Sequence, residues 1–127
     1  MELNDWFETK SFFVRAEESS KIRKKYNDRF PIIVGTSKNA PSISAFKYLA
    51  PREMTIGMFL YTLRNKMTIA KDQAIFLFII KYKGKSCTEI EEQLLAPITK
   101  MIGDLYYDYA SDDGFLYVQY QVESTFG

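Results

Sequence analysis

A seven-residue run of apolar side chains constrains the fold of this chain more than any other segment. The run Ala74–Ile80 contains no polar residue, so both faces of a strand formed there are apolar. Such a strand is typical of the buried centre of a sheet. The run is far shorter than the roughly 20 residues that a membrane-spanning helix requires. At 127 residues in total, the chain is expected to form one domain around this central strand.

Three segments around this strand have the apolar spacing of three and four residues that predicts amphipathic helices. Ser11 and Thr55 are predicted N-caps of the first and second, and Pro97 is expected to begin the third. A shorter helix, opened by Asn4, is expected before them. The apolar or small positions are Phe12, Ala16, Ser19, Ile22 and Tyr26; Ile56, Phe59, Leu60, Leu63 and Met67; and Ile98, Met101, Ile102, Leu105, Tyr106 and Tyr109.

Three further strands are predicted from β-branched and alternating sequences. Arg29–Val34 and Ala45–Ala50 form a hairpin across the turn-rich segment Gly35–Ser44, and Phe115–Val122 is the last strand. The order is two helices followed by β-β-α-β-α-β. A helix packed on one face of a mixed sheet is a stable two-layer arrangement. The sequence therefore predicts an α+β fold, the ubiquitin-like β-grasp, with a four-stranded mixed sheet and two additional N-terminal helices.

The composition excludes several classes of function. The chain has no histidine, which excludes Ser–His and Cys–His dyads and histidine-bearing zinc sites. One cysteine cannot form an internal disulfide, which suits a reducing compartment. The acidic first ten residues do not resemble a signal peptide. We expect a cytoplasmic protein that is not an enzyme and that has no metal and no cofactor.

Charge is distributed unevenly although the net charge is +1. Residues 15–29 hold six basic and three acidic side chains, a net +3, whereas residues 104–127 hold five acidic side chains and no basic one. This asymmetry favours steering of partners. One short basic stretch does not indicate nucleic-acid binding. The adjacent carboxylates Asp112 and Asp113, before Gly114, are interpreted as a solvated turn rather than a catalytic pair.

Four stretches of sequence, in order along the chain, carry a resemblance to a known family. They are Arg29-Phe30-Pro31-Ile32-Ile33; Lys47–Pro51 followed by Met54–Phe59; Ala74–Phe78; and Asp113–Tyr120 with the terminal Thr125-Phe126-Gly127. From Phe12 to Gly127 the chain resembles the autophagy-related ubiquitin-like modifiers, the family of autophagy-related protein 8, GABARAP and microtubule-associated protein light chain 3. The helical extension, residues 1–28, is what separates this family from ubiquitin.

The resemblance implies a modifier that marks membranes. Its C-terminal glycine, Gly127 here, would be joined to phosphatidylethanolamine by a ubiquitin-activating-type enzyme and a conjugating-type enzyme, with a cysteine protease for processing or deconjugation. Receptor and adaptor proteins carrying aromatic–x–x–aliphatic motifs would be its other partners. The lipidated form would lie on autophagosomal or related membranes, and the protein itself would be a monomer.

The resemblance also implies which residues bind such a motif. An extended peptide can add to an open strand edge while pockets read its side chains. The aromatic-anchor pocket would comprise Glu18, Ile22, Pro31, Ile33, Lys47, Leu49 and Phe115. The aliphatic-anchor pocket would comprise Tyr48, Ala50, Pro51, Met54, Phe59 and Thr62, and the peptide's charges would meet Arg29, Lys47 and Lys66. From periodicity alone, Ile33, Phe59 and Phe115 are equally suited to the core.

Two segments depart from the main pattern. Residues 81–95 are longer than the corresponding family loop, and Thr88 with Glu91 is a capping-box pattern that predicts an extra helix of one to two turns. Cys87 lies there without a histidine to activate it, which favours an inert thiol. Residues 121–127 are expected to leave the sheet as a C-terminal tail. Two alternatives to the lipid-conjugated modifier stay open: an unconjugated peptide-binding adaptor in vesicle or organelle traffic, and a modifier of proteins.

Overall fold

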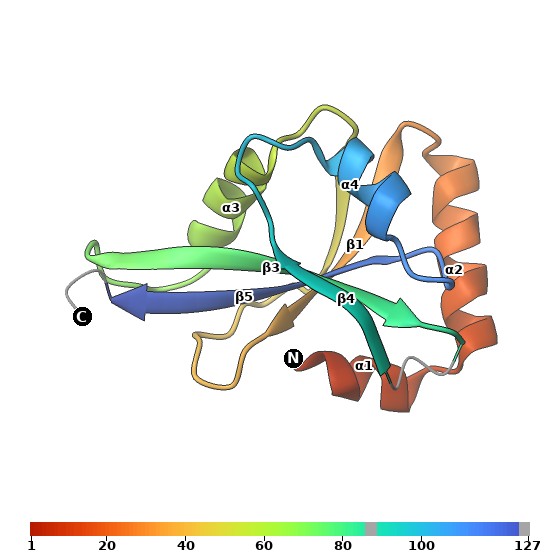
Figure 1. The fold of residues 1–127 in the computed structure, drawn as a ribbon, viewed down its shortest axis with the longest axis horizontal. Helices are drawn as coiled ribbons and strands as arrows, with labels where there is room; N and C mark the ends of the chain where they lie inside the picture. Colours follow the sequence, from red (N-terminus) through yellow and green to blue (C-terminus); the bar gives the residue numbers. More distant parts are fainter. Residues whose placement is uncertain (86–88, 125–127) are drawn as a thin grey trace.

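The computed structural model describes residues 1–85 and 89–124, in which four helices and five strands form an α+β domain (Figure 1). In chain order the elements are α1 (Leu3–Thr9), α2 (Phe12–Lys25), β1 (Arg29–Thr36), β2 (Lys47–Pro51), α3 (Ile56–Arg64), β3 (Gln73–Lys83), β4 (Glu89–Leu95), α4 (Ile102–Tyr109) and β5 (Leu116–Ser124). The predicted class and the two N-terminal helices are confirmed.

The five strands form one mixed sheet in the order β2-β1-β5-β3-β4. β1 and β5 are parallel, and the other neighbours are antiparallel. The strand predicted from Ala74–Ile80 is central, as expected, because β3 pairs on both sides. Leu77, Ile79 and Ile80 within it are fully buried, whereas Phe76 and Phe78 are half-buried.

Helices lie on both sides of the sheet (Figure 1), and each face has its own apolar core. The larger core lies under α3 and α4, and includes Phe59 and Leu105. The smaller core lies under α1, where Leu3 and Trp6 pack on the opposite face. The predicted caps of α2 and α3 are present, since the Ser11 and Thr55 hydroxyls each accept a backbone N–H three residues on. α1 begins at Leu3, with Glu2 rather than Asn4 before it.

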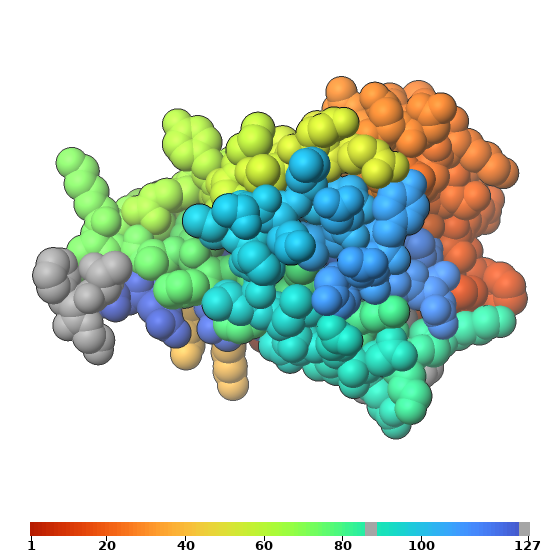
Figure 2. Space-filling view, turned by 45° about the horizontal axis from the view of Figure 1, so that its top comes forward, coloured from red at the N-terminus to blue at the C-terminus, as the bar shows by residue number. Residues whose placement is uncertain are grey.

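The extra helix predicted for residues 81–95 is wrong, because the segment forms strand β4. Residues Glu89–Leu95 pair antiparallel with β3 and run beside α4 (Figure 2). The predicted four-stranded sheet therefore has five strands. Pairing with β4 satisfies the backbone groups along the outer edge of β3, and this gain from sheet pairing outweighs a local helix signal. Thr88, the proposed cap, lies outside the described residues.

The helix predicted to begin at Pro97 begins instead at Ile102. The intervening backbone is hydrogen-bonded across the fold, since the amides of Ile56 and Gly57 donate to the carbonyls of Lys100 and Ile98, both at 2.9 Å. A carbonyl directed across the fold in this way does not point along a helix axis, as the acceptor of an intrahelical bond must.

The predicted departure of the chain from the sheet at Gln121 is also wrong for the residues that the structure describes. β5 continues to Ser124, and its last four residues pair with the start of β3, ending with Ser124 opposite Gln73. Residues 125–127 lie outside the described part of the chain.

Candidate functional site

β2 lies at one end of the sheet, and its outer edge is the candidate docking edge. Its five residues pair with β1 on the inner side, from Arg29 opposite Pro51 to Ile33 opposite Lys47. Within the described chain no other strand pairs with β2. Main-chain donors and acceptors along such an edge are free to bind an extended polypeptide.

A hollow of about 220 Å³ opens beside this edge, between α2 and β2. Five of the seven residues predicted for the aromatic-anchor pocket line it together with Ile32 and Tyr48; the five are Ile22, Pro31, Lys47, Leu49 and Phe115. Leu49 is 36% exposed, whereas Phe115 is 1% exposed. The hollow thus has an accessible wall and a buried floor.

The two remaining predicted residues have other positions. Glu18 forms ion pairs with Lys47, which lines the hollow, and with Lys10 at 2.9 Å. Ile33 is fully buried in the core beneath α1. The structure therefore supports the core interpretation for Ile33.

Trp6 is a component of this site that the sequence reasoning did not single out. Its ring lies edge-on to Phe115, with centroids 5.6 Å apart, and Lys47 Nζ lies 5.3 Å from its centroid. Its indole N–H donates to the Tyr117 hydroxyl at 3.0 Å. Trp6 is the chain's one tryptophan, so its fluorescence can report on events in the hollow. The spacing of Leu3 and Trp6 on one helix face was the available signal.

Glu18 is held in its charged form by two lysines. Partial burial raises the pKa of its carboxyl, but hydrogen bonds and charge from Lys47 and Lys10 outweigh this and hold the pKa below its ordinary value. Glu18 therefore stays ionised near neutral pH and keeps Lys47 beside the hollow. A carboxylate on a bound peptide would compete with Glu18 for Lys47.

We expect Glu18→Gln to lower the free energy of unfolding at neutral pH by about 0.2–1 kcal/mol per lost ion pair. Because the pKa of Glu18 is lowered on folding, its ion pairs stabilise the fold above the carboxyl's unfolded pKa. Their contribution is lost as pH falls through the lowered pKa. Urea unfolding at a series of pH values should show the two proteins converging at acidic pH.

Glu17→Gln is the matched control for this prediction. Glu17 pairs with Lys21 on the same helix, and both side chains are at least two-thirds exposed. Its replacement should change stability by no more than a few tenths of a kcal/mol. A difference between wild type and Glu18→Gln that persists at acidic pH would contradict the ion-pair explanation.

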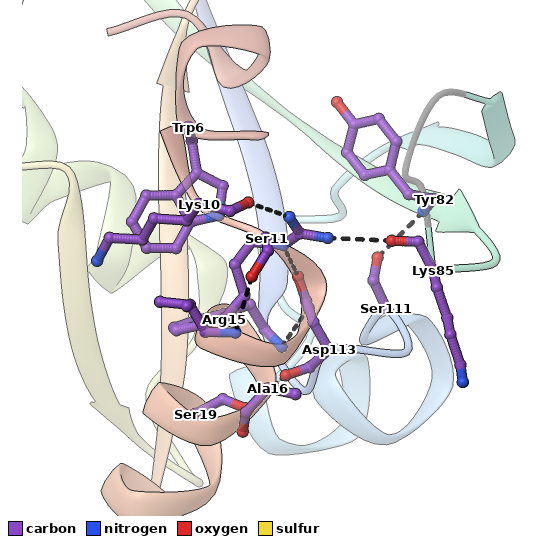
Figure 3. A network of polar contacts seen from close by, with 12 residues as sticks. Trp6, Lys10, Ser11, Arg15, Ala16, Ser19, Tyr82, Lys85, Ser111 and Asp113 are labelled. Carbon is purple, nitrogen blue, oxygen red and sulfur yellow. Dashed lines mark hydrogen bonds and ion pairs between the residues drawn. The ribbon is translucent and has the colours of Figure 1, made fainter. Parts of the chain in front are cut away.

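A buried polar network beneath the hollow fixes α2 against the turn before β5 (Figure 3). Arg15 Nε donates to Asp113 Oδ2 at 2.8 Å, and the two side chains are 3% and 0% exposed. Tyr117 donates to the same oxygen, the amide of Phe115 donates to Oδ1, and Ser19 donates to the Asp113 carbonyl. The interpretation of Asp113 as part of a solvated turn is therefore wrong, although Asp112 is exposed.

This network extends from the turn to both N-terminal helices and the β3–β4 hairpin. Arg15 also donates to the carbonyls of Lys10 and Lys85. Burial, followed by the charge of Asp113, raises the pKa of Tyr117 far above its ordinary value, so its hydroxyl stays protonated and remains a donor. Because Phe115 follows this turn directly, the network positions the floor of the hollow.

The aliphatic-anchor set is brought together in part. Two of its six predicted residues, Met54 and Thr62, line a second hollow of about 500 Å³. The other residues that line this hollow are Thr55, Gly57, Met58 and Tyr61. Ala50 and Phe59 are 1% and 2% exposed and belong to the larger core. Tyr48 packs edge-on against Phe59, with ring centroids 5.5 Å apart. Ala50 and Phe59 are therefore core residues, and Tyr48 lines the first hollow rather than the second.

The remaining predicted residues flank β2 or lie outside the described chain. Arg29 is exposed at the start of β1, and Lys66 Nζ lies 5.9 Å from the Tyr48 ring centroid. Gly127 and Cys87 fall outside the described residues. In residues 1–85 and 89–124, no cluster of three acidic or sulfur ligands could hold a metal, and no helix has the length and apolarity needed to cross a membrane.

Comparison with known proteins agrees with this geometry. Residues 14–127 match the family model described as autophagy protein Atg8, ubiquitin-like. Autophagy-related protein 8e of Arabidopsis thaliana is 35% identical over 118 residues, which cover 91% of this chain and 87% of the relative. Autophagy-related protein 8 of Schizosaccharomyces pombe is 35% identical over 119 residues, which cover 92% and 88%.

Solved structures show the same fold. The crystal structure of Trypanosoma brucei ATG8 is similar with a TM-score of 0.73 and 28% identity, covering 93% of both chains. Plasmodium falciparum Atg8, solved in complex with a Plasmodium falciparum Atg3 peptide, has a TM-score of 0.72 and 28% identity, covering 92% of this chain and 94% of that one. The resemblance carried by the four sequence stretches is thereby confirmed: the chain belongs to the Atg8 family of ubiquitin-like autophagy proteins.

Proposed function

We propose that this protein is conjugated through Gly127 to phosphatidylethanolamine and marks autophagosomal or related membranes. Membership of the Atg8 family, with a match that extends to residue 127, carries this proposal. An activating-type enzyme and a conjugating-type enzyme would transfer the glycine, and a cysteine protease would process or release it. Before conjugation the protein is cytoplasmic. It acts as a substrate and an adaptor rather than as a catalyst.

The conjugating enzyme is the partner with the most direct support. Plasmodium falciparum Atg8, whose fold this chain shares, was solved with a peptide of Atg3. An equivalent peptide would add to the β2 edge here. A ubiquitin-like protein that docks its conjugating enzyme and its receptors at one edge can engage only one of them at a time.

Receptor recruitment would use the same edge and its two hollows. An aromatic side chain of the motif would enter the hollow between Ile22 and Leu49, and an aliphatic one would lie against Met54 and Thr62. The cations Arg29, Lys47 and Lys66 lie along this route and suit acidic residues that flank the motif. The fit of an apolar hollow beside an open strand edge supports peptide binding.

The conjugation proposal is tested by gel-shift analysis of the protein from its own cells, before and after phospholipase D treatment. A faster-migrating form that is found in the membrane fraction and is lost after phospholipase D is the expected result. A membrane-associated protein with no such form would favour the unconjugated trafficking adaptor. A slower ladder resistant to phospholipase D would favour conjugation to proteins.

We expect Leu49→Ala to weaken binding of an aromatic–x–x–aliphatic peptide by about 1–3 kcal/mol. Leu49 is the exposed wall of the first hollow, and its replacement removes apolar contact with the aromatic anchor. Titration calorimetry, checked by Trp6 fluorescence, measures the change in Kd.

Leu95→Ala provides the matched control, because Leu95 is also an exposed strand leucine but lies on β4. This variant should bind the same peptide as tightly as wild type. Equal affinity of the Leu49→Ala protein would remove the first hollow from the binding site.

A further inference from the structure

β4 gives the sheet a second open edge, at the end opposite β2. Its seven residues pair with β3 on the inner side, and in the described chain its outer side has no partner strand. Six of the seven are exposed, including Ile90 at 51% and Leu95 at 52%. A strand of this length with half-exposed aliphatic side chains offers a template for an added strand.

The register with β3 sorts the β4 side chains onto two chemically different faces. In the strand register, Glu89 lies opposite Lys83 and Glu92 lies opposite Lys81. Lys81 Nζ donates to the Asp108 carbonyl on α4, so these side chains lie on the α4 face of the sheet. Glu91 at the bulge also reaches Lys81, at 3.5 Å. Glu89 likewise reaches Lys83, at 4.0 Å, so three carboxylates share this face with two lysines and its net charge is negative.

The opposite face of β4 is apolar or neutral. Ile90 and Gln93 pair with Tyr82 and Ile80, which belong to the smaller core beneath α1. Both line a hollow of about 360 Å³ between β4 and the start of α1. Successive side chains of a strand point to opposite faces, so a neighbouring strand would meet carboxylates on one face and Ile90, Gln93 and Leu95 on the other.

We infer that the outer edge of β4 binds an extended polypeptide segment of another protein in which basic and apolar side chains alternate. The basic side chains would lie on the α4 face beside Glu89, Glu91 and Glu92. The apolar ones would lie on the α1 face beside Ile90 and Leu95. Main-chain hydrogen bonds to β4 would supply affinity, and the alternating charge would supply selectivity.

The same charges exclude a second copy of this chain as the occupant. Two β4 strands paired edge to edge would bring the three glutamates of each chain together, and like charges on neighbouring strands are destabilising. The helix beside β4, α4 (Figure 2), carries the exposed Asp104 and Asp108, which add to this repulsion. A basic segment experiences the reverse, an attraction that strengthens as salt is lowered.

The probe that tests this inference is a synthetic peptide of alternating lysine and valine. Titration calorimetry should detect binding to the full chain at low salt, and hydrogen exchange should show new protection of the β4 amides. Replacing Glu89, Glu91 and Glu92 together by glutamine should weaken binding about tenfold, because three ion pairs are removed. A peptide N-methylated at alternate residues, with the same charge, should lose most of the affinity because it cannot pair with the strand.

A second triple variant controls for net charge, and a single variant controls for the β2 edge. Glu17→Gln, Asp28→Asn and Glu53→Gln remove three exposed carboxylates from other surfaces and should leave affinity within about twofold of wild type. Leu49→Ala should not change binding of the lysine–valine peptide. This result distinguishes binding at the β4 edge from binding at the proposed receptor site on β2. If the proposed receptor function proved wrong, the test of the β4 edge would still be valid.

Three results would overturn the inference. One is equal binding of the N-methylated peptide, which would indicate electrostatic attraction without strand addition. Another is protection that appears on β2 rather than β4. The third is a concentration-dependent dimer of the free protein with protected β4 amides, which would make a second copy the occupant.

Discussion

Gly127→Ala is expected to abolish or severely slow conjugation while the free energy of unfolding and the affinity for motif peptides stay unchanged. The carboxylate of this residue would be adenylated and carried as a thioester, so its backbone has to enter the active-site groove of another protein. Glycine allows close approach and any φ that the groove imposes, whereas a Cβ restricts both. Reconstituted conjugation with the activating-type and conjugating-type enzymes and phosphatidylethanolamine vesicles measures the effect.

Gly84→Ala is the matched control, because it makes the same substitution at an exposed position in the β3–β4 hairpin. Gly84 has a φ of +69°, and an added Cβ would meet nothing within 4 Å. The alanine costs about 1–2 kcal/mol of backbone strain and should leave conjugation intact. If Gly127→Ala still forms the lipid-linked product at the wild-type rate, Gly127 is not the reactive end, and the trafficking adaptor becomes the better proposal.

Asp113→Ala is expected to lower the free energy of unfolding by about 3–5 kcal/mol, a large part of the stability of a domain of this size. The substitution leaves the Arg15 guanidinium buried without its carboxylate, and Tyr117 and the Phe115 amide lose their acceptor. Urea unfolding followed by Trp6 fluorescence gives the change. Since Phe115 forms the floor of the first hollow, peptide affinity should fall as well.

Asp112→Ala separates the buried network from the charge of the turn. Asp112 is the exposed neighbour of Asp113, and its replacement should change stability by no more than about 0.5 kcal/mol. If Asp113→Ala and Asp112→Ala unfold at the same urea concentration, the Arg15–Asp113 pair does not hold α2 to the sheet.

The fold class followed from local sequence, and much of the first hollow followed from the resemblance to the family. The caps at Ser11 and Thr55 act within three residues, so the sequence nearby is sufficient to specify them. The apolar run Ala74–Ile80 indicated a central strand because it is short, rich in isoleucine and phenylalanine, and apolar on both faces. The residues of the β2 edge were identified through their resemblance to a family, and five of the seven assigned to the first pocket line one hollow.

Strand β4 is where prediction from the local sequence failed, because a helix was expected there. Its sequence has helical features, but β3 extends to Lys83 and presents backbone groups that need partners. The prediction of a helix beginning at Pro97 failed for a similar reason, because carbonyls of this segment accept hydrogen bonds from the amides of residues 56 and 57. In both cases the deciding hydrogen bonds lie outside the segment itself: β4 bonds to the preceding strand, and the segment after Pro97 bonds to the start of α3.

The sequence by itself determined the starts of α2 and α3, the central strand and the family, because caps, periodicity and motifs are local properties. Only the tertiary structure decided which charges are structural. Arg15 and Asp113 look like ordinary surface charges in the sequence, yet they are 98 residues apart and form a buried pair. A buried charge is stable when a partner neutralises it, and that partner becomes visible once the chain has folded.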